Sequence, residues 1–226
     1  MDTGLTKDEL ISFEENVKEA FLTGKIFAPI HLSKNNEEPL IEIFGEVKPE
    51  DWVFSTHRSH YHALLKGVPP ERVKAEILAG RSIHLMFKEY NFFTSAIVGG
   101  CLPIALGAAM AIRRKGEKRR VWCFVGDMAA EMGIFHEVVK YARNFDLPLC
   151  VVVECNGLST NTPTYEVWGI AHNHRPKAGV RVIEEWGNGK VLFYCYDRCW
   201  PHVGPGVWVD FDQKGEAKEE RSDVMA

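Results

Sequence analysis

Asp127 and Asn156 are the two side chains whose type and spacing point most directly to chemistry. Each follows a short apolar run, residues 121–125 before Gly126-Asp127 and residues 149–153 shortly before Asn156. Both side chains offer hard oxygen atoms. Two such oxygens and a backbone carbonyl suit Mg²⁺ or Ca²⁺, which often also takes phosphate oxygens as ligands. The pair therefore predicts a site where a metal ion holds a diphosphate.

The residues between the two apolar runs have the pattern of a crossover helix. Its apolar face is formed by Phe135, Val138, Val139 and Ala142. Strand, helix and strand at these lengths form a βαβ unit with parallel strands and a right-handed crossover. Asp127 and Asn156 then lie at the carboxyl ends of parallel strands, where open α/β sheets bind ligands. A helix that starts near Ala130 is expected to direct its N-terminus at the same place, which favours an anion.

An ordinary βαβ unit is the alternative interpretation of the same spacing. In that case Asp127 is only the N-cap of a helix, and Asn156-Gly157 is only a turn. The spacing by itself leaves both interpretations open.

Length and charge exclude several classes of protein. A chain of 226 residues can bury a good core, and we expect a single domain over residues 1–212 and a disordered charged tail over residues 213–226. The net charge of −4 argues against a nucleic-acid partner. The longest apolar stretch, residues 96–112, contains Gly and Pro and is short for a membrane span.

The N-terminus and the cysteines predict a cytoplasmic protein. The opening residues 1–10 lack a basic region followed by an apolar one, so no signal peptide is expected. Cys101, Cys123 and Cys150 lie in apolar runs, which is typical of buried thiols in a reducing compartment.

Gly126-Asp127, followed at this distance by Asn156, resembles the thiamine-diphosphate motif, which usually reads Gly-Asp-Gly and then Asn-Asn. The resemblance implies that Asp127, Asn156 and the backbone carbonyl of Leu158 bind Mg²⁺. It also implies that Gly126 lies beside the cofactor.

The chain departs from this motif at two positions. Met128 replaces the second Gly and Cys155 replaces the first Asn, and neither position is a metal ligand in the family. The resemblance still places Met128 and Ala129 among the residues that bind the cofactor. Met128 is expected to crowd a place where the backbone approaches the diphosphate.

Residues 14–33 resemble the opening helix and loop of the alpha subunit of thiamine-diphosphate-dependent 2-oxo-acid dehydrogenases, of the pyruvate or branched-chain type, in a shortened form. The family then shows Tyr-Arg-x-His after a strand, and its aromatic-Arg pair binds the diphosphate. Arg58 and His60 match this pattern. His57 replaces the tyrosine and can still donate a hydrogen bond. A polar loop without a role is the alternative for His60.

Residues 96–100 resemble the family's Gly-Ile-Val-Gly segment, which holds the aminopyrimidine ring and supports the bent shape of the cofactor. Ala96 and Val98 are the matching positions. The alternative for Val98 is a core residue at the start of a helix.

After Thr160 the chain departs from the family pattern. Residues 180–186 and 190–196 alternate around a Gly-Asn-Gly turn, which predicts a β-hairpin. The loop that follows lies where the family has a Tyr-His-Gly-His loop, and His202 matches the histidine that contacts the diphosphate side and the substrate. Zinc binding by Cys195, Cys199 and His202 is disfavoured, because strand residues four apart lie about 13 Å from each other.

The sequence thus predicts an α/β protein with a central parallel sheet, helices on both faces and a short C-terminal β-hairpin. The resemblance implies the thiamine-diphosphate-binding fold and decarboxylation of a 2-oxo acid. Thiamine diphosphate and Mg²⁺ are the implied cofactors, and His202 and His60 would steer protons or the substrate carboxylate.

The implied partner is a beta subunit, in an α₂β₂ assembly that could also meet a lipoyl-bearing acyltransferase. The family takes the glutamate that activates the cofactor from a separate beta polypeptide, and the motif does not repeat within this chain. Half of a split transketolase-like enzyme and a non-catalytic diphosphate-binding module are the alternatives. A 2-oxo-acid decarboxylase releases carbon dioxide, and this product distinguishes it from the transketolase-like enzyme.

Overall fold

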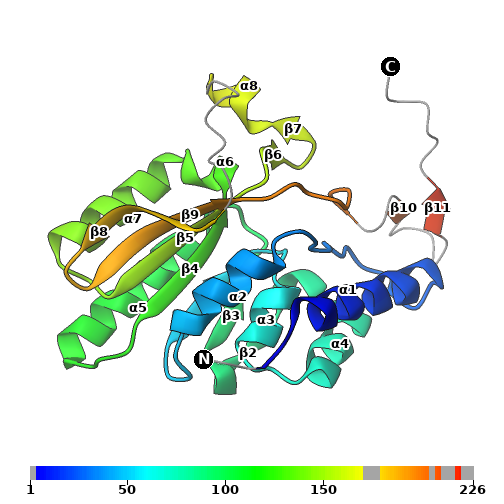
Figure 1. Ribbon diagram of the computed structural model, residues 1–226, viewed down its shortest axis with the longest axis horizontal. Coiled ribbons are helices and arrows are strands. Elements are labelled where there is room, and N and C mark those ends of the chain that lie inside the picture. The colour runs from blue at the N-terminus through cyan, green and yellow to red at the C-terminus, as the bar shows by residue number, and fades with distance from the viewer. Residues whose placement is uncertain (1–3, 170–178, 204–206, 210–216, 220–226) are drawn as a thin grey trace.

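The computed structural model describes residues 4–169, 179–203, 207–209 and 217–219. Its centre is a seven-stranded sheet in the order β2-β3-β1-β4-β5-β9-β8 (Figure 1). The strands are β1 (Trp52–Ser55), β2 (Met86–Phe87), β3 (Phe92–Thr94), β4 (Val121–Gly126), β5 (Leu149–Cys155), β8 (Arg181–Trp186) and β9 (Gly189–Cys195). The five central strands are parallel, and the edge strands β2 and β8 are antiparallel to their neighbours.

Helices cover both faces of the sheet (Figure 1). One layer consists of α1 (Lys7–Leu22), α2 (Glu37–Glu46), α3 (His60–Leu65) and α4 (Pro70–Leu78). The opposite layer consists of α5 (Cys101–Lys115) and α7 (Gly133–Asn144). Shorter elements connect the layers: η1 (Ser82–His84), η2 (Lys88–Tyr90), α6 (Asp127–Ala130), β6 (Leu158–Ser159), β7 (Thr162–Pro163) and α8 (Thr164–Trp168). Among the described residues, none of the helices is both long and apolar enough to cross a membrane.

Alternation along the central strands supplies a hydrophobic core to each helical layer. In β4, Trp122 and Phe124 belong to the core under α1 to α4, whereas Val121, Cys123 and Val125 belong to the core under α5 and α7. All five are buried because a parallel sheet between two helical layers has no solvent-facing side. The packing of both layers therefore fixes the position of the β4 carboxyl end.

The predicted fold is confirmed, and the C-terminal hairpin is part of the sheet. Strands β8 and β9 pair in antiparallel fashion as expected, and β9 also pairs in parallel with β5, with Cys155 opposite Cys195. The three cysteines expected to be buried, at positions 101, 123 and 150, are buried free thiols.

The helix expected to start near Ala130 is divided into two. The four-residue α6 begins at Asp127 itself, and α7 begins only at Gly133. Met132 adopts an extended backbone conformation between them, which breaks the helical hydrogen-bond ladder. Within the tail expected to be disordered, residues 217–219 form β11 (Ala217–Glu219), which pairs with β10 (Val207–Val209), and the other tail residues lie outside the described part.

Gly189 is required by close packing where β9 begins. It is buried, and a Cβ atom at this position would overlap the carbonyl oxygen of Leu149 and lie 2.6 Å from the Trp186 ring. Gly107 offers a contrast, because it is exposed within α5 and a Cβ there would meet no atom within 4 Å.

We predict opposite effects for the two alanine substitutions. Gly189→Ala should lower the free energy of unfolding by about 1–3 kcal/mol, because the β5–β9 pairing must shift. Gly107→Ala should raise it by about 0.5–1 kcal/mol, because alanine is the better helix former. Urea denaturation of the three proteins measures both effects. Equal stability of Gly189→Ala and the parent protein would contradict the packing described here.

Candidate functional site

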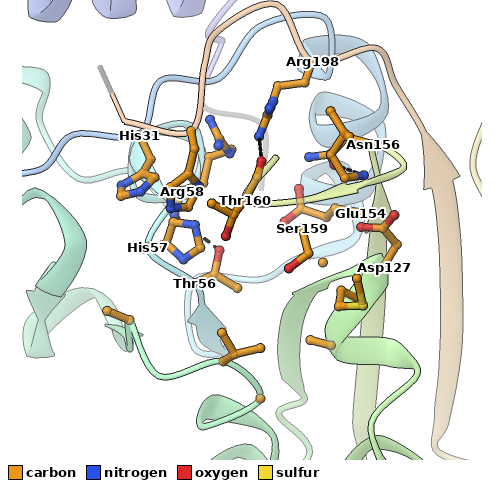
Figure 2. Close-up of a pocket in the computed structure, with 18 of the residues that line it drawn as sticks. His31, Thr56, His57, Arg58, Asp127, Glu154, Asn156, Ser159, Thr160 and Arg198 are labelled. Carbon is orange, nitrogen blue, oxygen red and sulfur yellow. Dashed lines mark hydrogen bonds between the residues drawn. The ribbon is translucent and has the colours of Figure 1, made fainter. Parts of the chain in front are cut away.

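A cavity of about 290 Å³ opens at the carboxyl ends of the parallel strands (Figure 2). The residue that follows each of four adjacent strands lines it: Thr56 after β1, Asp127 after β4, Asn156 after β5 and Tyr196 after β9. Parallel strands place their carboxyl ends on one edge of the sheet, so side chains far apart in sequence meet there.

The structure brings most of the predicted site residues together in this cavity. The residues predicted to bind cofactor or metal all line it: His57, Arg58, Ala96, Val98, Gly126, Asp127, Met128, Ala129, Asn156 and Leu158. His202, predicted to be catalytic, also lines the cavity, whereas His60 does not.

The Asp127 side chain links the carboxyl end of β4 to the segment after β5 by a hydrogen bond. Its Oδ2 accepts hydrogen bonds from Gly157 N and from Thr164 Oγ1, each at 2.9 Å. The carboxyl group is buried, and burial raises the pKa of Asp127, while these hydrogen bonds act in the opposite direction. A buried carboxylate with a raised pKa favours proton or cation binding, so the Asp127 carboxylate suits a bound metal ion.

Asn156 and Leu158 complete the oxygen-rich side of the cavity. Asn156 Oδ1 accepts a hydrogen bond from Leu158 N at 3.0 Å, and Asn156 Nδ2 donates to the Tyr196 hydroxyl at 3.1 Å. These contacts fix the amide so that its oxygen lies on the side of Leu158. Together with Asp127, the segment offers a carboxylate, an amide oxygen and backbone carbonyls, the ligand types that Mg²⁺ prefers.

The two departures from the thiamine-diphosphate motif are accommodated locally. Met128 lies in α6 with a negative φ, so this position does not need glycine for its backbone conformation. The Met128 sulfur accepts a hydrogen bond from Trp168 Nε1 at 2.7 Å. The Cys155 thiol lies 3.8 Å from Asp127 Oδ2. Met128 therefore restricts the cavity through its side chain alone.

Two arginine side chains line the cavity, Arg58 across from Asp127 and Arg198 above Thr160 (Figure 2). The Arg58 guanidinium is buried and donates to the Leu32 carbonyl. Arg198 donates to the Thr160 carbonyl and to Asn161 Oδ1. Two guanidinium groups facing a cavity suit a phosphate or carboxylate ligand.

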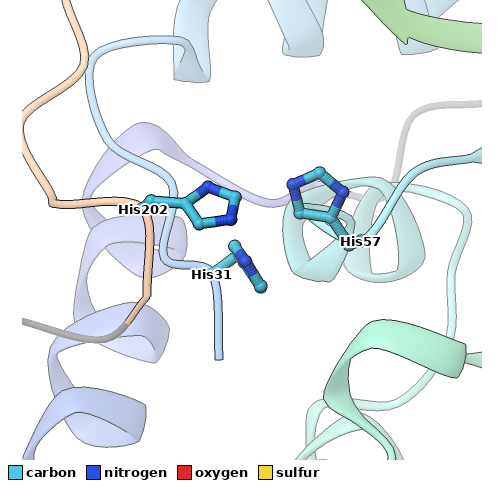
Figure 3. Close-up of side chains that lie close together, drawn as sticks. All are labelled: His31, His57 and His202. Carbon is cyan, nitrogen blue, oxygen red and sulfur yellow. The ribbon is translucent and has the colours of Figure 1, made fainter. Parts of the chain in front are cut away.

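Three histidine side chains meet beside Arg58, namely His31, His57 and His202 (Figure 3). Burial is the largest cause that lowers the pKa of each ring, and the charge of Arg58 acts in the same direction. The pKa of His57 falls to about 4. The rings are therefore neutral at pH 7.

His60 lies outside the cavity and supports the loop that forms part of its wall. It is fully buried in α3, where its Nδ1 lies 3.0 Å from Glu14 Oε2 and its Nε2 lies 2.8 Å from Ser82 Oγ. The other Glu14 oxygen accepts a hydrogen bond from Ser33 N at 3.0 Å. His60 thus positions the loop that carries His31, and its geometry favours this role over direct contact with a ligand.

Several lining residues were not predicted from the sequence. His31 lies within the segment that resembles the family, and a histidine between two apolar residues was the available signal. Arg198 lies four positions before His202 in the same loop, and both line the cavity. The position of Arg198 in that loop was the available signal. Glu154 and Tyr196 are interpretable only after β9 is placed beside β5.

The chain is similar in sequence to several known proteins. The family model for the dehydrogenase E1 component matches residues 7–173. The pyruvate dehydrogenase E1 component subunit alpha of Porphyra purpurea is 32% identical over 191 residues, which cover 77% of this chain and 53% of that protein. The alpha subunit of acetoin:2,6-dichlorophenolindophenol oxidoreductase of Bacillus subtilis (strain 168) is 32% identical over 165 residues, 69% of this chain and 50% of that protein.

A chloroplastic pyruvate dehydrogenase E1 component subunit alpha-3 of Arabidopsis thaliana is 30% identical over 72% of this chain and 40% of its own length. The chain therefore spans about half the length of the curated relatives it matches.

The lowered pKa of His57 predicts a pH-dependent stability. The ring stays neutral in the folded protein down to about pH 4, whereas the unfolded chain takes up a proton near the ordinary value of 6.5. The contribution of His57 to stability is therefore present above pH 6.5 and is lost as the pH falls toward 4. His57→Gln should reduce the slope of the free energy of unfolding in this window by up to about 1.4 kcal/mol per pH unit.

Urea denaturation at a series of pH values measures this slope. His136→Gln, on the exposed face of α7, is the matched control and should keep the parent slope. An unchanged slope in His57→Gln would show that this ring is not held neutral by its surroundings.

Proposed function

Because the chain belongs to the dehydrogenase E1 component family, we propose that it binds thiamine diphosphate through Mg²⁺ and acts as the alpha-type component that decarboxylates a 2-oxo acid. The observation that carries this proposal is one cavity with an oxygen-rich side and a basic side. The family uses thiamine diphosphate, and a diphosphate bridged by a metal ion needs both kinds of side.

Asp127, Asn156 and the Leu158 carbonyl are proposed to hold Mg²⁺. The fit rests on the buried carboxylate of Asp127. Burial raises its pKa, and the hydrogen bonds from Gly157 and Thr164, which act in the opposite direction, do not offset the effect of burial. A carbonyl oxygen has two lone pairs, so Asn156 Oδ1 can accept the Leu158 N–H and still bind a cation. The bound ion would neutralise Asp127 and one face of the diphosphate.

Arg58, His57 and Arg198 are proposed to bind the other side of the diphosphate. Arg58 is anchored by its bond to Leu32, so its remaining donors are held at the cavity wall. Ala96 and Val98 lie on the segment between β3 and α5, where they are proposed to position the pyrimidine ring. Val98 has 57% of its surface exposed, which argues against the alternative of a core residue.

When bound, thiamine diphosphate supplies the carbon nucleophile and the electron sink for decarboxylation. The residues of this chain are proposed to orient the cofactor and to contact the substrate. His202 lines the cavity from the loop after β9 and is proposed to contact the substrate carboxylate or move a proton. His60, bonded to Glu14 and Ser82, is proposed to support catalysis by positioning the cavity wall.

A partner chain is proposed to complete the site. Two exposed apolar side chains line the cavity, Ile97 at 75% and Val98 at 57% exposure, and Trp168, at 46% exposure, contacts the lining residue Met128. Such a rim suits a large apolar interface. Glu154, which also lines the cavity, is already bonded to the Tyr194 hydroxyl. We therefore assign the glutamate that activates the cofactor to a beta subunit, in a cytoplasmic α₂β₂ assembly able to pass its product to a lipoyl-bearing acyltransferase.

Cofactor binding should depend on Asp127. At a hundredfold excess over the dissociation constant, thiamine diphosphate with Mg²⁺ should stabilise the chain by about 2.7 kcal/mol, seen as a rise in Tm. Asp127→Ala should abolish the rise, because it removes the charged metal ligand. Asp8→Ala, in the exposed first turn of α1, is the control and should keep it. A full rise in Asp127→Ala would remove the metal assignment.

Turnover should require the partner. Carbon dioxide release from pyruvate and branched 2-oxo acids should be absent with the purified chain and present after co-expression with a beta subunit, because the activating glutamate is assigned to that partner. Robust release by the isolated chain would instead direct attention to Glu154, and Glu154→Gln would then test it.

A further inference from the structure

The three histidines beside the cavity come from three separate segments. His31 lies in the loop after α1, His57 follows β1 and His202 lies in the loop after β9 (Figure 3). One ring nitrogen from each lies within 4.8 Å of the other two. In the part of the chain that the structure describes, this is the one group of three histidine, cysteine or acidic side chains placed closely enough to share a metal ion.

The ring positions are close to those of a loaded site. Three imidazoles on one tetrahedral ion, with Zn–N bonds of about 2.0–2.1 Å, have ring centres about 5 Å apart. The observed separations are 4.3 Å for His31 and His57, 4.6 Å for His31 and His202, and 5.7 Å for His57 and His202. The ligand nitrogens lie within 4.8 Å of one another and must approach by up to about 1.5 Å to reach tetrahedral spacing. Rotation of the rings together with sub-ångström shifts of their centres would achieve this.

His31 has a polar atom that needs a partner. Only 5% of its surface is exposed, and its Nδ1 is buried without a hydrogen bond. A buried ring nitrogen left unpaired costs about 1–3 kcal/mol. Edge-to-face packing of three rings would explain their closeness but leaves this atom unsatisfied, whereas a metal ion bound through Nδ1 would satisfy it.

The positive charges of the neighbouring arginines favour an anion as the fourth ligand of the metal ion. The guanidinium groups of Arg58 and Arg198 act on the His202 ring, and both line the same cavity. They would repel a bare dication. An anion on the open position of the ion would pair with both groups, since catalytic-type sites with three histidine ligands keep one position open.

We propose that His31, His57 and His202 form a binding site for a divalent transition metal ion of the Zn²⁺ class, whose open position faces the cavity and takes an oxyanion. Neutral imidazoles are ligands that Zn²⁺ and Co²⁺ prefer over Mg²⁺. This site differs in ligand chemistry from the oxygen-rich side at Asp127. It shares His57 and His202 with the proposed diphosphate and substrate contacts, so its test is made without thiamine diphosphate and its outcome is independent of the proposed function.

Cobalt absorption tests the site directly. The purified chain, freed of metal with a chelator and kept reduced, is titrated with Co²⁺ without thiamine diphosphate. One equivalent should give the visible bands of tetrahedral Co²⁺, which Zn²⁺ should abolish and Mg²⁺ should not. His202→Gln and His57→Gln should each bind Co²⁺ at least tenfold more weakly, with Tm and circular dichroism confirming that both fold.

Two controls distinguish the three-histidine site from a surface histidine and from the oxygen-rich side of the cavity. His136→Gln should bind Co²⁺ as the parent does. Asp127→Ala should keep the tetrahedral Co²⁺ bands, even though it loses the cofactor response and any Co²⁺ held by the oxygen-rich side. Addition of inorganic phosphate should shift the Co²⁺ bands of the parent. The proposal is wrong if the parent shows no tetrahedral bands, if the bands survive in both histidine variants, or if near-ultraviolet thiolate charge-transfer bands show that cysteines hold the ion.

Discussion

The pairing of β4 with β5 is the constraint on which the site depends. Gly126 lies opposite Glu154 in this register, so Asp127 and the segment after Cys155 leave the sheet side by side. The hydrogen bond from Gly157 N to Asp127 Oδ2 then closes the gap between them. A shift by one residue would turn the strand side chains to the other layer and separate the carboxylate from its partners. Burial in both cores prevents such a shift.

The opposite side of the cavity depends on a different arrangement. Glu14 in α1 bonds both Ser33 and His60, and Arg58 bonds Leu32, so the loop that carries His31 is held at two adjacent points. These are charged groups buried with hydrogen-bonding partners, which is the condition for their being tolerated in a core. This network around Glu14 and Arg58 is separate from the contacts of Asp127, whereas Arg198 joins the two sides of the cavity through its bonds to Thr160 and Asn161.

The sequence predicted the βαβ unit and the strand-end residues because apolar periodicity and Gly-Asp are local signals. The structure brings four of the residues that the sequence singled out, Asp127, Asn156, Arg58 and Val98, to one cavity. The sequence could not show that the segment before Tyr196 joins the sheet beside β5, because that pairing is set by distant contacts. The grouping of His31 with His202 was hidden for the same reason. No spacing rule links a loop after the first helix to a loop after the last central strand.

Anomalous diffraction from crystals grown with thiamine diphosphate and Mn²⁺ in place of Mg²⁺ tests the central claim most directly. An anomalous peak is expected within bonding distance of Asp127, Asn156 Oδ1 and the Leu158 carbonyl oxygen, with the diphosphate extending from it toward Arg58. A diphosphate bound elsewhere, or a Mn²⁺ ion that contacts none of these three oxygens, would contradict it.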